Sequence, residues 1–176
     1  MLLIMQRIGW YDVLTNVKKV CRHWYVLSKN PSIWRVIELR RDVATKLREK
    51  MDIPTYQEYC SKVRFSEKRM ETFQYESKVL KMVNKVLEKM VMHVIDLSRG
   101  QLHDLCIVGL GSDNLFKYIY QRSRQLRRLR LENCFVCCYN YESHDYDGDI
   151  TLKGMFQMLR NLPLLEELEL PYTKIS

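Results

Sequence analysis

The chain has 176 residues, 47% of them hydrophobic, with six glycines and four prolines, which excludes disorder over the whole length and allows one core or two small ones. No segment approaches the ~20 apolar residues of a membrane-spanning helix, and the apolar start over residues 1–5 is too short for a signal peptide. The net charge of +8 is uneven: residues 1–101 carry 20 basic and 11 acidic residues, and residues 102–176 carry 9 and 10, which indicates two modules with different surfaces.

Residues 1–41 are predicted to form short helices joined by turns, with a strand at the end. Asp12 is placed to cap a helix that carries the apolar positions of residues 13–24, and Pro31 ends that helix. Apolar residues then alternate over residues 34–39, which is typical of a strand. We therefore expect a small, mainly all-α module at this end of the chain.

Residues 42–99 are predicted to form a basic helical connector. Charge is dense and periodicity weak as far as residue 78. From Val79 to Ile95, apolar residues recur at i+3, i+4 and i+7, which predicts an amphipathic helix. Gly100 supplies the stop signal, because glycine readily adopts the left-handed conformation that follows a helix.

Residues 100–176 repeat one pattern, Leu-x-x-Leu-x-Leu (with Ile in one copy), which predicts a short leucine-rich-repeat solenoid. The pattern occupies residues 102–107, 126–131 and 165–170. The first two copies start 24 residues apart, within the range of a leucine-rich repeat, and the third starts 39 residues later. Each copy should form a strand on the concave face of the solenoid, so the overall fold class is mixed α/β.

The residues between the repeats predict helices and one insertion. Residues 114–123 and 152–162 should return as helices on the convex face. The longer second interval leaves a polar and acidic insertion at about residues 135–149, which should loop out without disturbing the stack.

The cysteines do not have the spacing of a disulfide framework. Free thiols among apolar neighbours are typical of a reducing compartment, so we expect a cytoplasmic or nuclear protein. The six are Cys21, Cys60, Cys106, Cys134, Cys137 and Cys138.

Two patterns around the insertion resemble metal sites, but each lacks ligands. Cys134, Cys137 and Cys138 form half of a zinc site without the second pair of ligands that a structural site needs. The acidic run of residues 145–149 resembles the start of a calcium loop but lacks the glycine and glutamate that the motif requires further on. We expect neither a metal nor another cofactor.

Two segments resemble a known family. Residues 13–27, Val13 to Leu27, resemble the second and third helices of an F-box, and Pro31-Ser32-Ile33-Trp34 resembles its closing P-x-x-W. Together with the repeats, which are similar to the cysteine-containing type, the chain most resembles plant F-box/leucine-rich-repeat proteins. Met1 aligns inside the first F-box helix, so the resemblance implies an F-box that is truncated at its N-terminus.

The resemblance implies a substrate-recognition subunit of a Skp–cullin–F-box ubiquitin ligase. The helical module would dock on the Skp-type adaptor, and through it on cullin, while the repeats bind a protein substrate. A segment of 41 residues cannot bury all its apolar groups alone, so some of them should face a partner. The expected adaptor-binding residues are Leu3, Ile4, Ile8, Leu14, Val20 and Cys21.

The alternating positions of the repeat strands should project from the concave face toward a substrate. Arg128 and Arg130 lie between leucines in the middle strand, which favours an acidic protein substrate, and the strand after it is negative, so the face could select its partner by charge. The expected substrate-binding residues are Asp104, Cys106, Arg128, Arg130, Glu167 and Glu169.

Two further interpretations remain open. The chain could be a repeat-only interaction fragment that captures a partner without recruiting a ligase. A nucleic-acid binder is a weaker interpretation, because the basic runs at residues 46–50 and 124–130 come without a known binding motif, and we expect no nucleic-acid partner. No Ser-His-Asp arrangement, phosphate-binding glycine loop or paired carboxylates are present, so we expect no catalytic residue.

Overall fold

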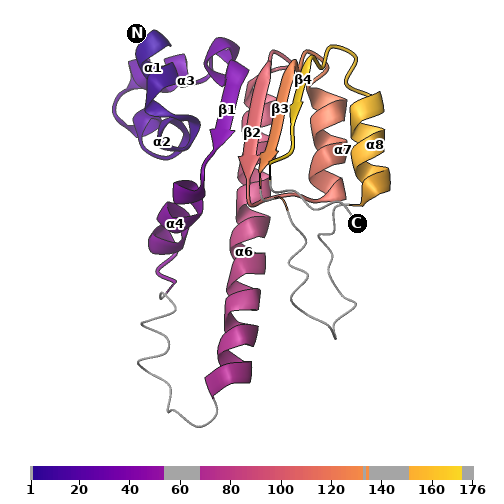
Figure 1. Cartoon of the computed structure of the whole chain (residues 1–176). Helices are drawn as coiled ribbons and strands as arrows, with labels where there is room; N and C mark the ends of the chain where they lie inside the picture. The colour runs from indigo at the N-terminus through magenta and orange to yellow at the C-terminus, as the bar shows by residue number, and fades with distance from the viewer. Residues whose placement is uncertain (1, 54–67, 133, 135–150, 172–176) are drawn as a thin grey trace.

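The structure is a computed structural model that describes residues 2–53, 68–132, 134 and 151–171 (Figure 1). Its centre is a parallel sheet whose four strands lie in chain order: β1 (Val36–Leu39), β2 (Asp104–Val108), β3 (Arg128–Glu132) and β4 (Glu167–Glu169). The expected mixed α/β class is confirmed.

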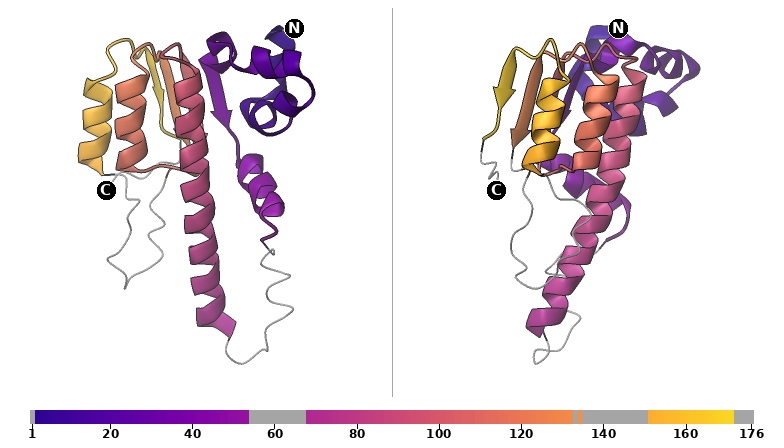
Figure 2. Two further views of the ribbon diagram at one scale, coloured as in Figure 1. Left: turned by 180° about the vertical axis from the view of Figure 1, so that it is seen from behind. Right: turned by 90° about the vertical axis from the view of Figure 1, so that its right-hand side faces the viewer.

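Three helices cover one face of the sheet, and none of the described elements covers the other, which we call the open face (Figure 2). They are α6 (Lys68–Leu97), α7 (Asp113–Arg122) and α8 (Leu152–Arg160), and each crosses from one strand to the next. The amphipathic helix predicted over residues 79–95 and the helices predicted at 114–123 and 152–162 are confirmed. The insertion expected at 135–149 lies outside the described residues.

The N-terminal module consists of short helices, as predicted, but the segment expected to form one helix over residues 13–24 is divided among several of them. Its elements are α1 (Leu2–Ile8), α2 (Trp10–Thr15), the 3-10 helix η1 (Val17–Lys19), α3 (Arg22–Ser28) and the 3-10 helix η2 (Pro31–Arg35).

The predicted cap at Asp12 is wrong, because this residue lies in the first turn of α2 and Gly9 occupies the cap position with φ of 89°. The helix predicted through residue 24 breaks at Asn16 and again at Cys21, which is fully extended. Asparagine and the β-branched Val17 that follows it have lower helix propensity than most residues, which explains a break at this place.

Trp34 is the internal anchor of the module. Its side chain is almost fully buried, and its indole Nε1 donates a 2.9 Å hydrogen bond to the carbonyl oxygen of Ser28. Asn30 caps η2 by accepting a hydrogen bond from the backbone N–H of Ser32. Trp24, the other tryptophan of the signature, is only partly buried against the core.

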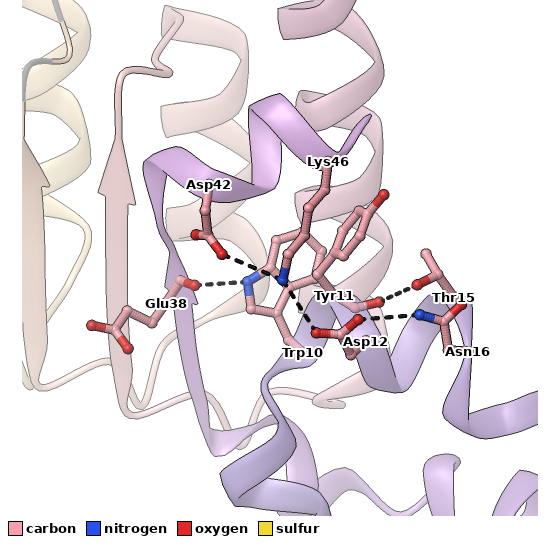
Figure 3. Close-up of polar contacts among 8 residues, drawn as sticks. All are labelled: Trp10, Tyr11, Asp12, Thr15, Asn16, Glu38, Asp42 and Lys46. Atoms are coloured by element: carbon pink, nitrogen blue, oxygen red, sulfur yellow. Dashed lines mark hydrogen bonds and ion pairs between the residues drawn. The ribbon is translucent and has the colours of Figure 1, made fainter. Parts of the chain in front are cut away.

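A second set of polar contacts joins α2 to β1 and to α4 (Arg41–Lys50), the helix that follows β1. The indole Nε1 of Trp10 donates to the carbonyl oxygen of Glu38 at 2.8 Å. Lys46 Nζ on α4 lies 3.5 Å from Oδ2 of Asp12 and 3.3 Å from Oδ2 of Asp42 (Figure 3). The helical module is therefore tied both to the first strand and to the helix that follows it.

Strand β1 acts as the first strand of the repeat array, which the sequence reading did not foresee. Ile37 pairs in register with Leu105, and Leu39 with Ile107. Trp34 and these two residues repeat the array's own spacing as Trp34-x-x-Ile37-x-Leu39. The sheet thus continues across residues 41 and 99, where domain boundaries were predicted; the division into 1–41, 42–99 and 100–176 stays a prediction.

The start of α7 is joined to the start of α8 by one carboxylate. Thr151 caps α8, and its backbone N–H and hydroxyl both donate to the carboxylate of Asp113, at 2.9 and 2.6 Å. A side chain at Gly154 would collide with this carboxylate, so glycine allows the close approach. The N-terminus of α8 also favours the negative charge.

Candidate interaction surfaces

The helical module leaves part of its apolar surface uncovered. Of the six expected adaptor-binding residues, Ile4, Val20 and Cys21 are exposed, whereas Ile8 and Leu14 are half-buried against the core. The side chain of Leu3 lies outside the described residues. The expected set therefore divides into an exposed part and a part that packs within the molecule.

Helix α3 shows this incomplete coverage most clearly. Ser28 is its buried residue, whereas Val26 is 59% exposed and Tyr25 is 44% exposed. Val20, one residue before the helix cap, is 67% exposed. An amphipathic helix of a folded domain normally buries an apolar stripe. In α3, Trp24 and Leu27 pack partly against the core, whereas Tyr25 and Val26 on the other side are exposed.

The charge around α3 is of one sign. Between Val17 and Lys29 there are four lysines and arginines and no acidic residue. A partner that covers the apolar side chains of α3 would meet positive charge around them. Acidic groups at the rim of that partner would be complementary.

The open face of the sheet carries the second candidate surface. Because strand residues alternate between faces, the six expected substrate-binding residues fall in two rows across it. Asp104, Arg128 and Glu167 are register partners in one row; Cys106, Arg130 and Glu169 form the other. Their assignment to a substrate stays a prediction.

Each arginine of this face pairs with carboxylates. Arg128 lies 3.1 Å from Glu167 and 3.9 Å from Asp104. Arg130 lies 3.1 Å from Glu169 and 3.3 Å from Glu132. The arginines are about half exposed or more, and Asp104 and Glu132 are 33% and 22% exposed, so every pair is in contact with solvent and contributes about 1 kcal/mol or less to stability.

Cys106 of β2 lies between its register partners Glu38 of β1 and Arg130 of β3 and is half-buried. Burial first, and then the charge of Glu38, raises the pKa of its thiol. The group is therefore neutral at physiological pH and a weak nucleophile.

Cys134, two residues after the end of β3, has a structural role as a buried hydrogen-bond donor. Its Sγ donates to the carbonyl oxygen of Ile107 at 3.5 Å, and burial raises the pKa of the thiol to about 12. This contact links adjacent repeats. Cys137, Cys138 and the acidic run at 145–149, considered above as ligands, lie outside the described residues.

The described part of the chain contains no cluster of three or more groups that could hold a metal ion. Within the same part, no helix is long and apolar enough to cross a bilayer.

Comparison with known proteins supplies the family. F-box/LRR-repeat protein 22 of Arabidopsis thaliana is 32% identical over 98% of this chain, and F-box protein SKIP19 of the same plant is 31% identical over 98%. F-box/LRR-repeat protein 23, also from Arabidopsis, is 29% identical over 98%. The chain is a relative of the plant F-box/leucine-rich-repeat proteins.

The match covers only part of these relatives. This F-box/leucine-rich-repeat relative spans 41%, 28% and 41% of the lengths of the three proteins just named. No known family profile matches the chain. No solved structure matches it either.

Sequence reasoning missed several residues of both surfaces. On the F-box-like module it missed Tyr25 and Val26, because apolar residues at helical spacing usually indicate core. On the sheet it missed Glu38, Arg40 and Glu132, which line the same hollow as the six expected residues. The spacing from Trp34 to Leu39 would have revealed the first two, since it repeats the pattern of the array.

Proposed function

We propose that the chain is a substrate-recognition subunit of a Skp–cullin–F-box ubiquitin ligase. In this proposal the helical module docks on a Skp-type adaptor, and through it on cullin, and the open face of the sheet holds a protein substrate. The chain itself has no catalytic step, because it acts by holding the substrate near the enzyme that carries ubiquitin.

The incomplete cover of α3 is the observation that carries the proposal. Val20, Tyr25 and Val26 are exposed on a module that is held to β1 through Trp10 and to α4 through Lys46. A folded module that leaves large apolar groups exposed to water is typical of a binding surface. The names of the relatives, as F-box proteins, favour an adaptor as the partner.

The alternative is a repeat-only interaction fragment that binds a partner without a ligase. It relies on the same open sheet face but assigns no binding role to the exposed residues of α3. It predicts undetectable association with the adaptor, and binding of a substrate that is unaffected by Trp24→Ala.

Binding of the full chain to Skp-type adaptors, measured by calorimetry or biolayer interferometry, tests the proposal. The double variant Val20→Asp/Val26→Asp should weaken the complex more than about tenfold, because it places charge in an apolar interface. The matched control Leu80→Asp/Phe156→Asp changes two exposed apolar residues on α6 and α8 and should leave binding unchanged. Absence of any complex at micromolar concentration, or equal losses in both variants, would remove the adaptor from the proposal.

A further inference from the structure

The arginines on the open face of the sheet are already occupied. Arg128 is held between Asp104 and Glu167, and Arg130 between Glu132 and Glu169, by the contacts given above. An acidic group of a partner could reach either guanidinium only by displacing these carboxylates or by approaching close to them. At 4 Å, each like-charged neighbour opposes it by about 1 kcal/mol even in water.

Acidic groups are in excess on the same face. The described residues that line the hollow include five carboxylates and three guanidiniums, a balance of −2 against +8 for the whole chain. Arg40, the third guanidinium, lies 2.7 Å from Glu38 and is therefore paired as well. The acidic residues are Glu38, Asp104, Glu132, Glu167 and Glu169.

The carboxylates keep capacity for further ligands. An ionised carboxylate has about four lone-pair positions, so pairing with one arginine leaves others free for a second donor. The side chains of Glu167 and Glu169 are more than half exposed, at 57% and 56%. Their Cα atoms are separated by roughly 7 Å along the strand, which is also the spacing of alternate side chains in an extended peptide.

We infer that the open sheet face binds a basic, extended segment of a protein, with lysine or arginine at alternate positions. Such a segment shares Glu167 and Glu169 with Arg128 and Arg130 instead of breaking their ion pairs. A basic segment differs from the acidic substrate that was expected from the arginines alone. The difference arises because the strand register places a carboxylate beside each arginine. The description of the segment as a substrate rests on the proposed function; the charge selectivity of the face does not.

Two short labelled peptides test the inference, one of alternating arginine and serine and one of alternating glutamate and serine. Binding to the full chain is measured by fluorescence anisotropy at about 50 mM and about 150 mM salt, since exposed charges are screened beyond ~10 Å. The arginine peptide should bind more tightly. The net charge of +8 favours the glutamate peptide nonspecifically, so a preference for arginine must come from a local surface.

Charge reversal locates that surface. Glu167→Lys/Glu169→Lys should weaken binding of the arginine peptide about tenfold. Glu49→Lys/Glu166→Lys is the matched control: it makes the same change in net charge at exposed residues off the face, and it also removes one ion pair, between Glu166 and Arg127. Binding of the control should change less than about twofold. A preference for the glutamate peptide, or equal losses in the two variants, would overturn the inference.

Protection of Cys106 gives a second readout. The bound arginine peptide should slow alkylation of the Cys106 thiol, while exposed Cys21 reacts as before. Mass spectrometry of the proteolytic fragments that contain each cysteine measures the two rates. Unchanged alkylation at saturating peptide would also contradict the inference. Adaptor binding by the variant Glu167→Lys/Glu169→Lys is measured in parallel. Adaptor binding tests the proposed function and peptide binding tests the inference, so failure of one is distinguished from failure of the other.

Discussion

The indole of Trp10 donates a hydrogen bond of 2.8 Å to the carbonyl oxygen of Glu38, on the outer edge of β1. The residues on either side of Glu38 direct their backbone groups toward β2, so this carbonyl points away from the sheet. An open edge of a parallel sheet offers unpaired groups to other chains. Trp10 satisfies one of them and fixes the helical module against the sheet.

Trp10→Phe should lower the free energy of unfolding by about 1–2 kcal/mol, because the aromatic packing is largely kept while the carbonyl of Glu38 loses its donor. Urea unfolding of the full chain measures the effect. Trp24→Phe is the control, since this half-buried indole donates to none of the described residues. Equal losses in the two variants would show that packing, and not the hydrogen bond, accounts for the change.

Gly154→Ala should destabilise the protein by about 1–3 kcal/mol, although alanine favours a helix by about 1 kcal/mol, because the new methyl group meets the Asp113 carboxylate. That carboxylate cannot move aside without losing its two hydrogen bonds to Thr151.

A double-mutant cycle separates this collision from other effects. Asp113→Ala alone should be destabilising, since it removes the contacts of Thr151, and Gly154→Ala added to it should cost little or even stabilise. Thermal unfolding of the four proteins gives the coupling. Additive losses would mean that the carboxylate does not cause the cost.

The buried thiol of Cys134 should make stability depend on pH in the alkaline range. Its folded-state pKa of about 12 lies above the reference value of 9.0, so below that value the thiol is neutral in both states and its contribution is complete. As pH rises from 9.0 toward 12, the unfolded state loses its proton first, and the contribution is progressively lost.

Comparison with Cys134→Ala isolates this effect, because all other groups titrate alike in the two proteins. The variant should be less stable at about pH 7.5, and the difference should narrow at about pH 10. In the native protein, iodoacetamide at about pH 8 should modify exposed Cys21 well before Cys134. Rapid native-state modification of Cys134 would contradict its burial.

Adaptor binding, if it occurs through α3, should weaken as salt is added. Lys18, Lys19, Arg22 and Lys29 surround the exposed apolar groups, and salt shortens the reach of their charge. Lys18→Glu/Lys19→Glu should lower the association rate several-fold, whereas Lys78→Glu/Lys85→Glu on α6 makes the same charge change elsewhere and should not. Equal effects of the two variants would indicate attraction by net charge alone.

Periodic elements of this chain are predictable from sequence, and the reason is local. Helix α6 and the strands from Leu102 onward follow from repeated spacings within a few residues. The breaks at Asn16 and Cys21 do not, because short helices depend on packing that no local pattern encodes. The pairing of β1 with β2 was missed for another reason: each residue of β1 pairs with a residue 68 positions further along the chain, which no local pattern reveals.

The candidate surfaces were partly predictable for similar reasons. Alternation alone places Arg128 and Arg130 on the open face. Their engagement by Glu167 and Glu169 depends on which residues stand opposite, and that is a matter of register between repeats. The exposure of Val26 could not be foreseen, because an apolar residue on a short helix has the same appearance in sequence whether the core or a partner covers it.

The position of β1 has a consequence for synthesis on the ribosome. The strand is made early, but β2 emerges only after residue 104, once α6 has been translated. Until then the module has an unpaired edge strand, and closing so long a loop makes its folding slow. The nascent N-terminal half is therefore exposed to aggregation and to capture by chaperones until the first repeat has left the exit tunnel.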